Sequence, residues 1–519
     1  MKTPARTHTI ILYLFFAAFL GIGLSVARDY GISWDEPNSR EHGIVALRYI
    51  IKGDQRLLDY EDRDYGPAFE MLLVGVEKGL RLTDPRTVYV MRHAATFLLF
   101  YISVIFFYLL CKKIFQSRKI GLVGSLFLIL SPRIFADSFY NSKDIPCMSL
   151  FIISTYTLIR YLDEKTLIRA FAHALACAIL IDIRVVGLLM PLLTALYIGI
   201  DTRVMGSMKM DTKKVTATFA VYMFFLIIFT VLFWPTLWKN PLRNFVSALW
   251  TMSRFEWPLT VFYFGRYLNG SALPWHYLPV WVAISTPIAY ILTFCIGYCG
   301  TVIALTKNPV EFYLRRKYDL IYLLWLTAPA LMVMTARPVM YDAWRQMFFV
   351  YPALVVFALL GLRSLFGLIK HHFHGATFVL MRATCVILMA VNVASALIFM
   401  VRYHPYQNLY FNRLAGKDMK AAQMNFELDY WGLSYRKALE YIVKHDSGAV
   451  IKLFVENVPG ELNAGMLDPD DRKRLVYVKD LGEAKYFVGN YRWFKEYPFK
   501  DEYCSIKING ASIIAVYRL

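Results

Sequence analysis

Residues 7–27, THTIILYLFFAAFLGIGLSVA, form an almost wholly apolar run. A helix needs roughly 17–25 such residues to cross the hydrocarbon core of a bilayer. A short basic start with Lys2 and Arg6 precedes the run, as in a signal peptide. The run is nevertheless longer than the apolar core of a usual signal peptide, and SVARDYG matches a cleavage site only loosely. We therefore expect a retained first membrane span.

The rest of the chain has the same apolar character. Of its 519 residues, 57% are hydrophobic and only 18% are charged, whereas soluble domains carry about 25% charged residues. Apolar runs of spanning length recur up to residue 401, which predicts an α-helical, multi-pass membrane protein with about eleven transmembrane helices. We expect these spans at about 8–27, 88–111, 119–136, 145–161, 166–182, 185–200, 215–234, 278–304, 319–336, 346–369 and 377–401.

The net charge of +19 comes largely from basic residues in short loops between apolar runs, at 111–119, 201–214 and 306–319. Such loops face the cytoplasm in multi-pass proteins. This placement explains the charge without a nucleic-acid partner and predicts a cytoplasmic N-terminus. An odd number of spans then places the C-terminus on the outer face. We expect the protein in the inner (plasma) membrane of a cell.

Two outer loops are long enough to carry structure. The first, about 28–87, has two amphipathic segments that begin at Pro37 and Pro67, so we expect two helices lying on the membrane. The second loop, about 235–277, is dense in aromatic residues and proline. We assign residues 1–401 to one transmembrane module.

The tail, residues 402–519, changes to a charged composition typical of a soluble domain. SYRKALEYIVKH predicts a helix, and AVIKLFVEN and RLVYVKD predict strands. Asn509-Gly510 suits the type I′ turn of a terminal hairpin. We expect a small α/β domain on the outer face.

Asp35 and Glu36 stand side by side in SWDEP, directly after the first span. Pro37 suits the first turn of a helix, whose N-terminus favours negative charge. One interpretation is that either acid only caps this helix. The other, given their position on the outer membrane surface, is that they perform chemistry.

A second group of charges lies in SPRIFADSFYNSKDIP, where we expect a short outer turn between two spans. Arg133, Asp137, Lys143 and Asp144 crowd this stretch. A connecting turn needs fewer polar residues, although the four could simply neutralise one another. Asp144 is placed to face a cavity shared with Asp35.

Three arginines lie at the outer ends of spans, against the cytoplasmic bias of positive charge: Arg184, Arg337 and Arg345. Arginine suits bidentate binding of phosphate. Pairing with Asp182 or Asp342 is the alternative role for these cations.

Carboxylates and phosphate-binding cations on one outer surface match the needs of a sugar linked to a lipid phosphate. A carboxylate would take the proton from an acceptor hydroxyl, whose oxygen attacks the anomeric carbon. Polyprenyl phosphate would leave as an anion held by arginine. Because phosphate leaves unprotonated, one base suffices, and the single displacement inverts the anomeric centre.

Several motifs resemble the GT-C superfamily of polyprenyl-phosphate-dependent glycosyltransferases, in particular bacterial members of family 39, akin to protein O-mannosyltransferases and the lipid A aminoarabinose transferase. The resemblance covers residues 1 to about 440. It implies that Asp35 is the base, with Glu36 beside it, and that Asp144 is a further acidic residue of the catalytic site. The motifs are SWDEP, YGPAFE, YNSKDIP, LPWHYLPVW, DAWRQMFFVYP, HPYQNLYFNRLAGK and DYWGLSYRKAL. The candidate substrate- or phosphate-binding residues are Lys143, Arg184, Arg345, Arg337, Tyr65 and His276.

The predicted partners are a polyprenyl-phosphate sugar donor, a lipid, glycan or protein acceptor in the cell envelope, and the bilayer itself. No cofactor is required, although two or three carboxylates could hold a divalent metal. The alternative function is a flippase or transporter of lipid-linked sugars, in which the charges would line a path. A third is a non-catalytic scaffold that presents the tail domain. The elaborate first loop argues against both.

Overall fold

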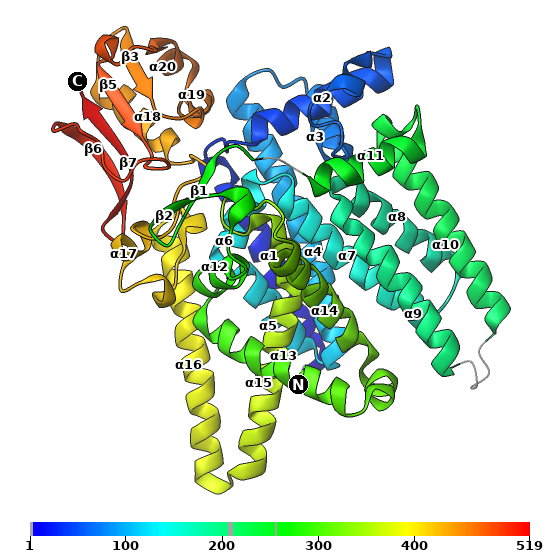
Figure 1. The fold of residues 1–519 in the computed structure, drawn as a ribbon. Helices are drawn as coiled ribbons and strands as arrows, with labels where there is room; N and C mark the ends of the chain where they lie inside the picture. The colour runs from blue at the N-terminus through cyan, green and yellow to red at the C-terminus, as the bar shows by residue number, and fades with distance from the viewer. Residues whose placement is uncertain (1–3, 206–210, 255–256) are drawn as a thin grey trace.

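The computed structural model describes residues 4–205, 211–254 and 257–519. It is a bundle of long helices with a small sheet at one end (Figure 1). Lys2 and residues 206–210, which belong to the basic segments predicted to face the cytoplasm, lie outside the described residues.

Within the described ranges, nine helical segments are long and apolar enough to cross a membrane, and a bent helix pair would make a tenth. The predicted multi-pass α-helical fold is therefore confirmed. α8 (Leu167–Ile183), with 17 residues, occupies the predicted span 166–182. The nine segments are carried by α1 (Pro4–Val26), α4 (Pro85–Phe115), α7 (Asp144–Asp163), α9 (Leu189–Met205), α10 (Thr212–Phe233), α13 (Ile288–Lys307), α14 (Pro309–Ala336), α15 (Tyr351–His372) and α16 (Gly375–Arg402).

Two of the predicted spans are interrupted at a proline. In the span expected at 119–136, α5 (Arg118–Ile129) and α6 (Pro132–Tyr140) meet at an angle of 69°. In the span expected at 278–304, α12 (Tyr277–Ser285) ends before α13 begins. The residue before Pro287 is extended, as proline requires of its predecessor. Each of these two predicted spans is therefore divided into two helices.

The charges of the second group do not all lie in a turn, contrary to the prediction. Arg133 and Asp137 belong to α6, and every residue of this helix is buried. Pro132 starts α6 because proline fits the first turn of a helix. Only residues 141–143 connect α6 to α7, so Lys143 and Asp144 alone stand at the predicted turn.

α13 and α15 pack in direct backbone contact through glycine. A Cβ atom on Gly297 would stand 2.0 Å from the carbonyl oxygen of Phe357, and one on Gly361 would stand 1.8 Å from that of Thr293. Small residues allow this approach, and close packing drives helix association inside a membrane. This contact fixes α15 against α13.

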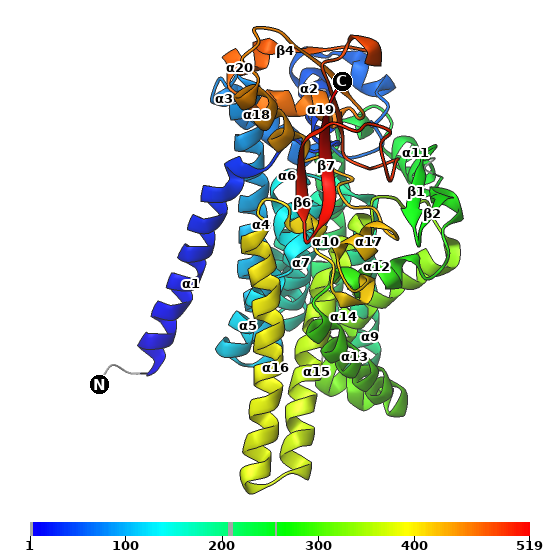
Figure 2. The same cartoon turned by 90° about the vertical axis from the view of Figure 1, so that its left-hand side faces the viewer.

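The first loop contains the two expected helices, α2 (Glu36–Lys52) and α3 (Ala68–Gly79). They lie at the same end of the bundle as the C-terminal sheet, while the N-terminus points toward the other end (Figures 1 and 2). The second loop adds α11 (Pro241–Ser253) and a hairpin of β1 (Thr260–Tyr263) and β2 (Arg266–Asn269).

The tail forms a five-stranded sheet in the order β4-β3-β5-β7-β6, in which β3 is parallel to β4 and β5 and the β5-β7-β6 part is antiparallel. The expected helix, strands and hairpin are present, with positive φ at Asn509 and Gly510. The sequence prediction missed β5, the middle strand. The elements are α17 (Met419–Gln423), α18 (Tyr435–His445), β3 (Ile451–Val455), α19 (Pro459–Leu462), α20 (Pro469–Arg474), β4 (Leu475–Tyr477), β5 (Tyr486–Gly489), β6 (Glu502–Ile508) and β7 (Ala511–Arg518).

Candidate active site

Four breaks between helices place charged side chains at the end of the bundle nearest the sheet. Asp35 directly precedes α2, and Asp144 begins α7. Arg184 is extended between α8 and α9, so its side chain is free of helical geometry. Arg345 begins the short 3-10 helix η7 (Arg345–Val350) that leads into α15. Segments far apart in sequence therefore meet at one site.

Arg345 is the centre of this site. Its Nη2 lies 3.1 Å from Oδ2 of Asp35 and 3.2 Å from Oδ2 of Asp342, and its Nη1 lies 3.2 Å from Oδ2 of Asp144. Its guanidinium also lies 4.6 Å from the ring centre of Trp431. Only 2% of the Arg345 side chain is exposed. A buried cation with three carboxylate partners is held firmly in place, because removing a partner leaves charge uncompensated.

A second arginine completes the pairing of Asp144. Arg184 forms an ion pair with Asp144, and 19% of its side chain stays exposed. Of the two aspartates considered from the sequence as alternative partners for these arginines, one has that role in the described part of the chain. Arg345 pairs with Asp342, whereas Asp182 instead accepts a hydrogen bond from the backbone N–H of Ala68.

The two neighbouring acids, Asp35 and Glu36, have different surroundings. Glu36 is 2% exposed and accepts a 2.7 Å hydrogen bond from the backbone N–H of Ser33. Nδ1 of His93 lies 3.1 Å from the carbonyl oxygen of Ala27, so Nδ1 carries a hydrogen. Nε2 of His93 lies 3.0 Å from Glu36, which places one shared proton between them. Glu36 is thus committed to internal partners.

Asp35 has 35% of its side chain exposed and can meet a substrate. Burial of the carboxyl opposes its charge, but Arg345, followed by Lys143, outweighs burial and lowers the pKa of Asp35 below the usual aspartate value. Asp35 is therefore ionised near neutral pH. Lys143 also lies 4.8 Å from the ring centre of Tyr65 and 3.8 Å from Asp62.

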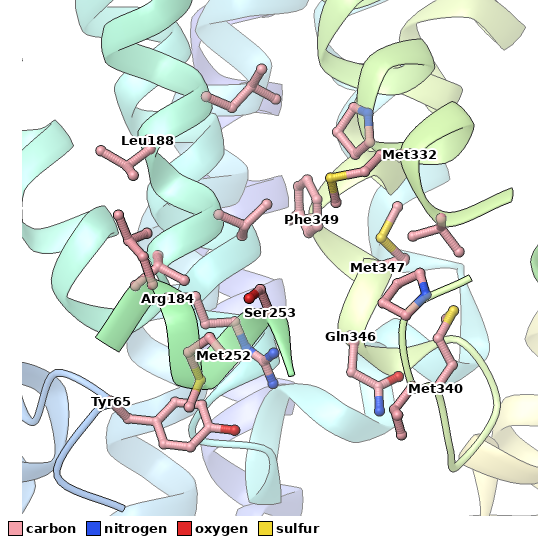
Figure 3. A pocket seen from close by; sticks show the side chains of 18 of the residues that line it. Tyr65, Arg184, Leu188, Met252, Ser253, Met332, Met340, Gln346, Met347 and Phe349 are labelled. Atoms are coloured by element: carbon pink, nitrogen blue, oxygen red, sulfur yellow. The ribbon is translucent and has the colours of Figure 1, made fainter. Parts of the chain in front are cut away.

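A cavity of about 490 Å³ opens beside these charges. Its wall is built by residues of the first loop, of the 3-10 helix η3 (Val185–Leu188), of α9, α11 and α14, and of the segment 338–349, and most of these residues are apolar. Figure 3 shows Leu188, Met332 and Phe349 toward one end of the cavity and Tyr65 and Arg184 toward the other. The cavity can therefore hold a molecule with an apolar part and an anionic end.

The C-terminal domain supplies a residue that sequence reasoning missed. Nη2 of Arg492 lies 2.7 Å from Oδ1 of Asp342, and its guanidinium lies 4.8 Å from the ring centre of Trp34. Trp34 directly precedes Asp35. Arg492 therefore connects the tail domain to the segment that carries Asp35 and to Asp342, a partner of Arg345. The surrounding segment, NYRWFKEYPFK, looks like an ordinary soluble surface and gave no signal.

Two further candidates do not join this cluster. His276 accepts or donates a 2.8 Å hydrogen bond with the hydroxyl of Tyr263, near the hairpin of the second loop. Arg337 ends α14 in a left-handed conformation and is exposed. No ion pair links either residue to Asp35, Asp144 or Arg345 in the described part of the chain. Their substrate-binding roles stay predictions.

The possible divalent metal also stays a prediction. Among the described residues, no three His, Cys, Asp or Glu side chains come together in an arrangement that could hold a metal ion.

The comparisons with known proteins give a match by structure. No family model matches the chain, and no curated protein matches it by sequence. The structure is similar to that of ArnT from Cupriavidus metallidurans bound to undecaprenyl phosphate, with a TM-score of 0.51 and 13% identity, over 97% of this chain and 98% of ArnT. A second similar structure is that of the archaeal oligosaccharyltransferase AglB from Archaeoglobus fulgidus in complex with an inhibitory peptide and a dolichol-phosphate. The match covers 92% of this chain and 69% of the AglB chain, with a TM-score of 0.48 and 8% identity.

The ArnT match extends over nearly the whole of both chains, including the tail domain as well as the helices. At 13% identity it is evidence about the fold. The chain therefore shares the fold of ArnT, which agrees with the membrane fold class predicted from the sequence.

Proposed function

We propose that this protein is a glycosyltransferase that moves a sugar from a polyprenyl-phosphate donor to a hydroxyl group of a lipid, glycan or protein acceptor. One observation carries the proposal: the apolar cavity ends at Arg184, and Arg184 forms an ion pair with Asp144. The buried Arg345 pairs with the same Asp144 and also with Asp35. A lipid chain fits the apolar wall, and its phosphate fits the cationic end.

The residues divide into distinct roles. Arg184 lines the cavity, so we assign it to the donor phosphate, with Tyr65 beside it. All ion pairs of Arg345 are to carboxylates, so we assign it to holding Asp35 and Asp144 in place rather than to the phosphate predicted from sequence. Such preorganised charge stabilises a developing anion without rearrangement during the reaction.

In the proposed reaction, the ionised Asp35 takes the proton of the acceptor hydroxyl. The hydroxyl oxygen then bonds to the anomeric carbon while the bond from that carbon to the phosphate oxygen breaks. The bonding electrons leave with polyprenyl phosphate, whose charge Arg184 balances. One displacement inverts the anomeric configuration, and Glu36, bound to His93, takes no part in proton transfer.

The proposal also includes an orientation. The site, α2 and α3 lie at one end of the bundle with the tail domain (Figure 1), and the basic loops 111–119 and 306–319 belong to the sequence segments expected in the cytoplasm. We place the site on the outer face of the inner membrane, with the N-terminus in the cytoplasm. We also assign the protein to family 39 on the motifs that resemble that family, from SWDEP in the first loop to DAWRQMFFVYP.

The test uses purified protein in liposomes, a panel of polyprenyl-phosphate monosaccharides labelled in the sugar, and a cell-envelope extract as acceptor. The expected result is release of polyprenyl phosphate together with transfer of label to the acceptor. A flippase would instead move the donor across the bilayer with its sugar–phosphate bond intact. That outcome, without any bond cleavage, would replace our proposal with the transporter alternative.

A further inference from the structure

A second cavity, of about 500 Å³, lies next to the apolar one. Ligand sites typically measure roughly 300–1,000 Å³. This second cavity is lined almost wholly by polar side chains from the first loop and from the region of η5 (Pro235–Leu237) and α11. We call it the polar cavity. It is lined by Gln55, Leu58, Asp59, Arg63, Asp64, Thr236, Lys239, Asn240, Asn244 and Ser247.

Specific contacts hold the walls of the polar cavity together. The indole N–H of Trp234 donates to the backbone carbonyl of Arg63 at 3.3 Å, which ties the first loop to the second. The side-chain amide of Asn244 donates to the carbonyl of Thr236 at 2.7 Å. The polar cavity is therefore built by two loops that are fixed to each other.

Asp64 lines both cavities. The residue is 8% exposed. Its carboxylate makes no hydrogen bond or ion pair with another residue in the described ranges, and its oxygens stay accessible through the cavities that Asp64 lines. The hydroxyl of Thr236, which also lines the polar cavity, is buried and has no partner in those ranges either. A buried polar group without a partner is costly and rare in native proteins, so the Thr236 hydroxyl points to a ligand. The open carboxylate of Asp64 can accept hydrogen bonds from donors on that ligand.

We propose that the polar cavity binds the sugar of the lipid-linked donor and that Asp64 accepts hydrogen bonds from its hydroxyl or amino groups. This inference rests on the proposed function. Asp64 is next in sequence to Tyr65, which lines the cationic end of the apolar cavity (Figure 3), and the sugar is bonded directly to the phosphate that this end would hold. A sugar passing from the phosphate into the polar cavity meets Asp64 first.

The chemistry of Asp64 selects a class of sugar. A carboxylate only accepts hydrogen bonds, so the facing position of the sugar must carry a hydroxyl or an amino group. A uronic acid that placed its own carboxylate against Asp64 would bring two anions together, so this position disfavours it. Polar sites of this kind discriminate strongly against analogues that leave a buried group unpaired.

The experiment compares binding of free polyprenyl phosphate with binding of polyprenyl-phosphate monosaccharides to purified full-length variants in detergent. We expect Asp64→Ala to weaken binding of the preferred sugar-bearing donor at least 10-fold and binding of free polyprenyl phosphate less than 2-fold. Thr236→Val should give a smaller loss of the same kind. Glu61→Ala is the matched control, because Glu61 is an exposed acid of the same loop and lines neither cavity.

Thermal unfolding supplies a second readout that needs no ligand. Asp64→Asn should unfold at the same temperature as the wild type, because the carboxylate that it replaces has no hydrogen-bond or ion-pair partner among the described residues. Equal weakening of both ligands, no weakening of either, or clear destabilisation by Asp64→Asn would each overturn the sugar assignment. Failure of the wild type to bind free polyprenyl phosphate would instead overturn the proposed function, and this inference with it.

Discussion

The contact between Arg492 and Asp342 predicts that the C-terminal domain is required for activity. Arg492→Ala removes a 2.7 Å ion pair whose side chains are 4% and 6% exposed. Breaking a buried pair from one side costs roughly 3–5 kcal/mol. Asp342 keeps Arg345 as a partner at 3.2 Å, so we expect a loss of about 3 kcal/mol, the lower end of that range.

This loss should reach the reaction through Arg345. Without Arg492, Asp342 competes more strongly for Arg345, which also holds Asp35 at 3.1 Å. If about half of the 3 kcal/mol is lost from the positioning of Asp35, kcat falls about 10-fold, since 1.36 kcal/mol corresponds to one factor of ten. Arg492→Lys keeps the charge but loses the bidentate geometry of a guanidinium, so its kcat should lie between that of the wild type and that of Arg492→Ala.

The assay measures sugar transfer per folded protein together with thermal unfolding in detergent. Arg474→Ala is the matched control, because Arg474 pairs with Asp471 at 3.0 Å in the same domain and contacts no residue of the site. We expect both alanine variants to unfold at lower temperature, but only Arg492→Ala to lose kcat. Equal loss of kcat in both variants, or full kcat in Arg492→Ala, would refute this reasoning.

Three other predictions concern different parts of the chain. Glu36→Ala leaves the N–H of Ser33 and the ring of His93 without the partner that Glu36 provides, so it should lower the free energy of unfolding by about 2–4 kcal/mol. Glu36→Gln should lower it by about 1 kcal/mol. Thermal or denaturant unfolding measures both values, and equal stability of the two variants would contradict this reasoning. Because the pKa of Asp35 is lowered, its charge is lost only as pH falls below the usual aspartate range, so kcat/KM should show no acid limb from Asp35 between pH 5 and 8. Lys143→Met removes one of the cations that lower this pKa, so it should move the acid limb to higher pH, and an unmoved limb would count against the electrostatic account. Cys504, on β6, should react with an impermeant thiol reagent from the outer side, and labelling from the cytoplasm alone would reverse the topology.

The fold could largely be predicted because a membrane imposes strong constraints on sequence. Apolar runs of spanning length identified the helices, but such runs continue through Pro132 and Pro287, so hydropathy alone could not show the breaks. β5 was missed because YFVG is short and lacks the alternation of a half-buried strand. Its strand character comes from pairing with β3 and β7, which is a tertiary effect.

The candidate site was partly visible in sequence for a related reason. Charges such as Asp35 and Arg345 stand out against apolar surroundings, and the outer ends of spans bring such residues near one another. Arg492 lies in a charged soluble domain where one more arginine carries no signal. Asp64 follows four other acids between residues 54 and 62, so only the structure shows that it lines two cavities.

The central claim is that Asp35, and not its neighbour Glu36, is the base in sugar transfer. The most direct measurement is the release of polyprenyl phosphate from a labelled polyprenyl-phosphate monosaccharide by Asp35→Asn and Glu36→Gln variants at equal amounts of folded protein. We predict that Asp35→Asn releases none above background while Glu36→Gln keeps more than a tenth of the wild-type rate. Full release by Asp35→Asn would contradict the account.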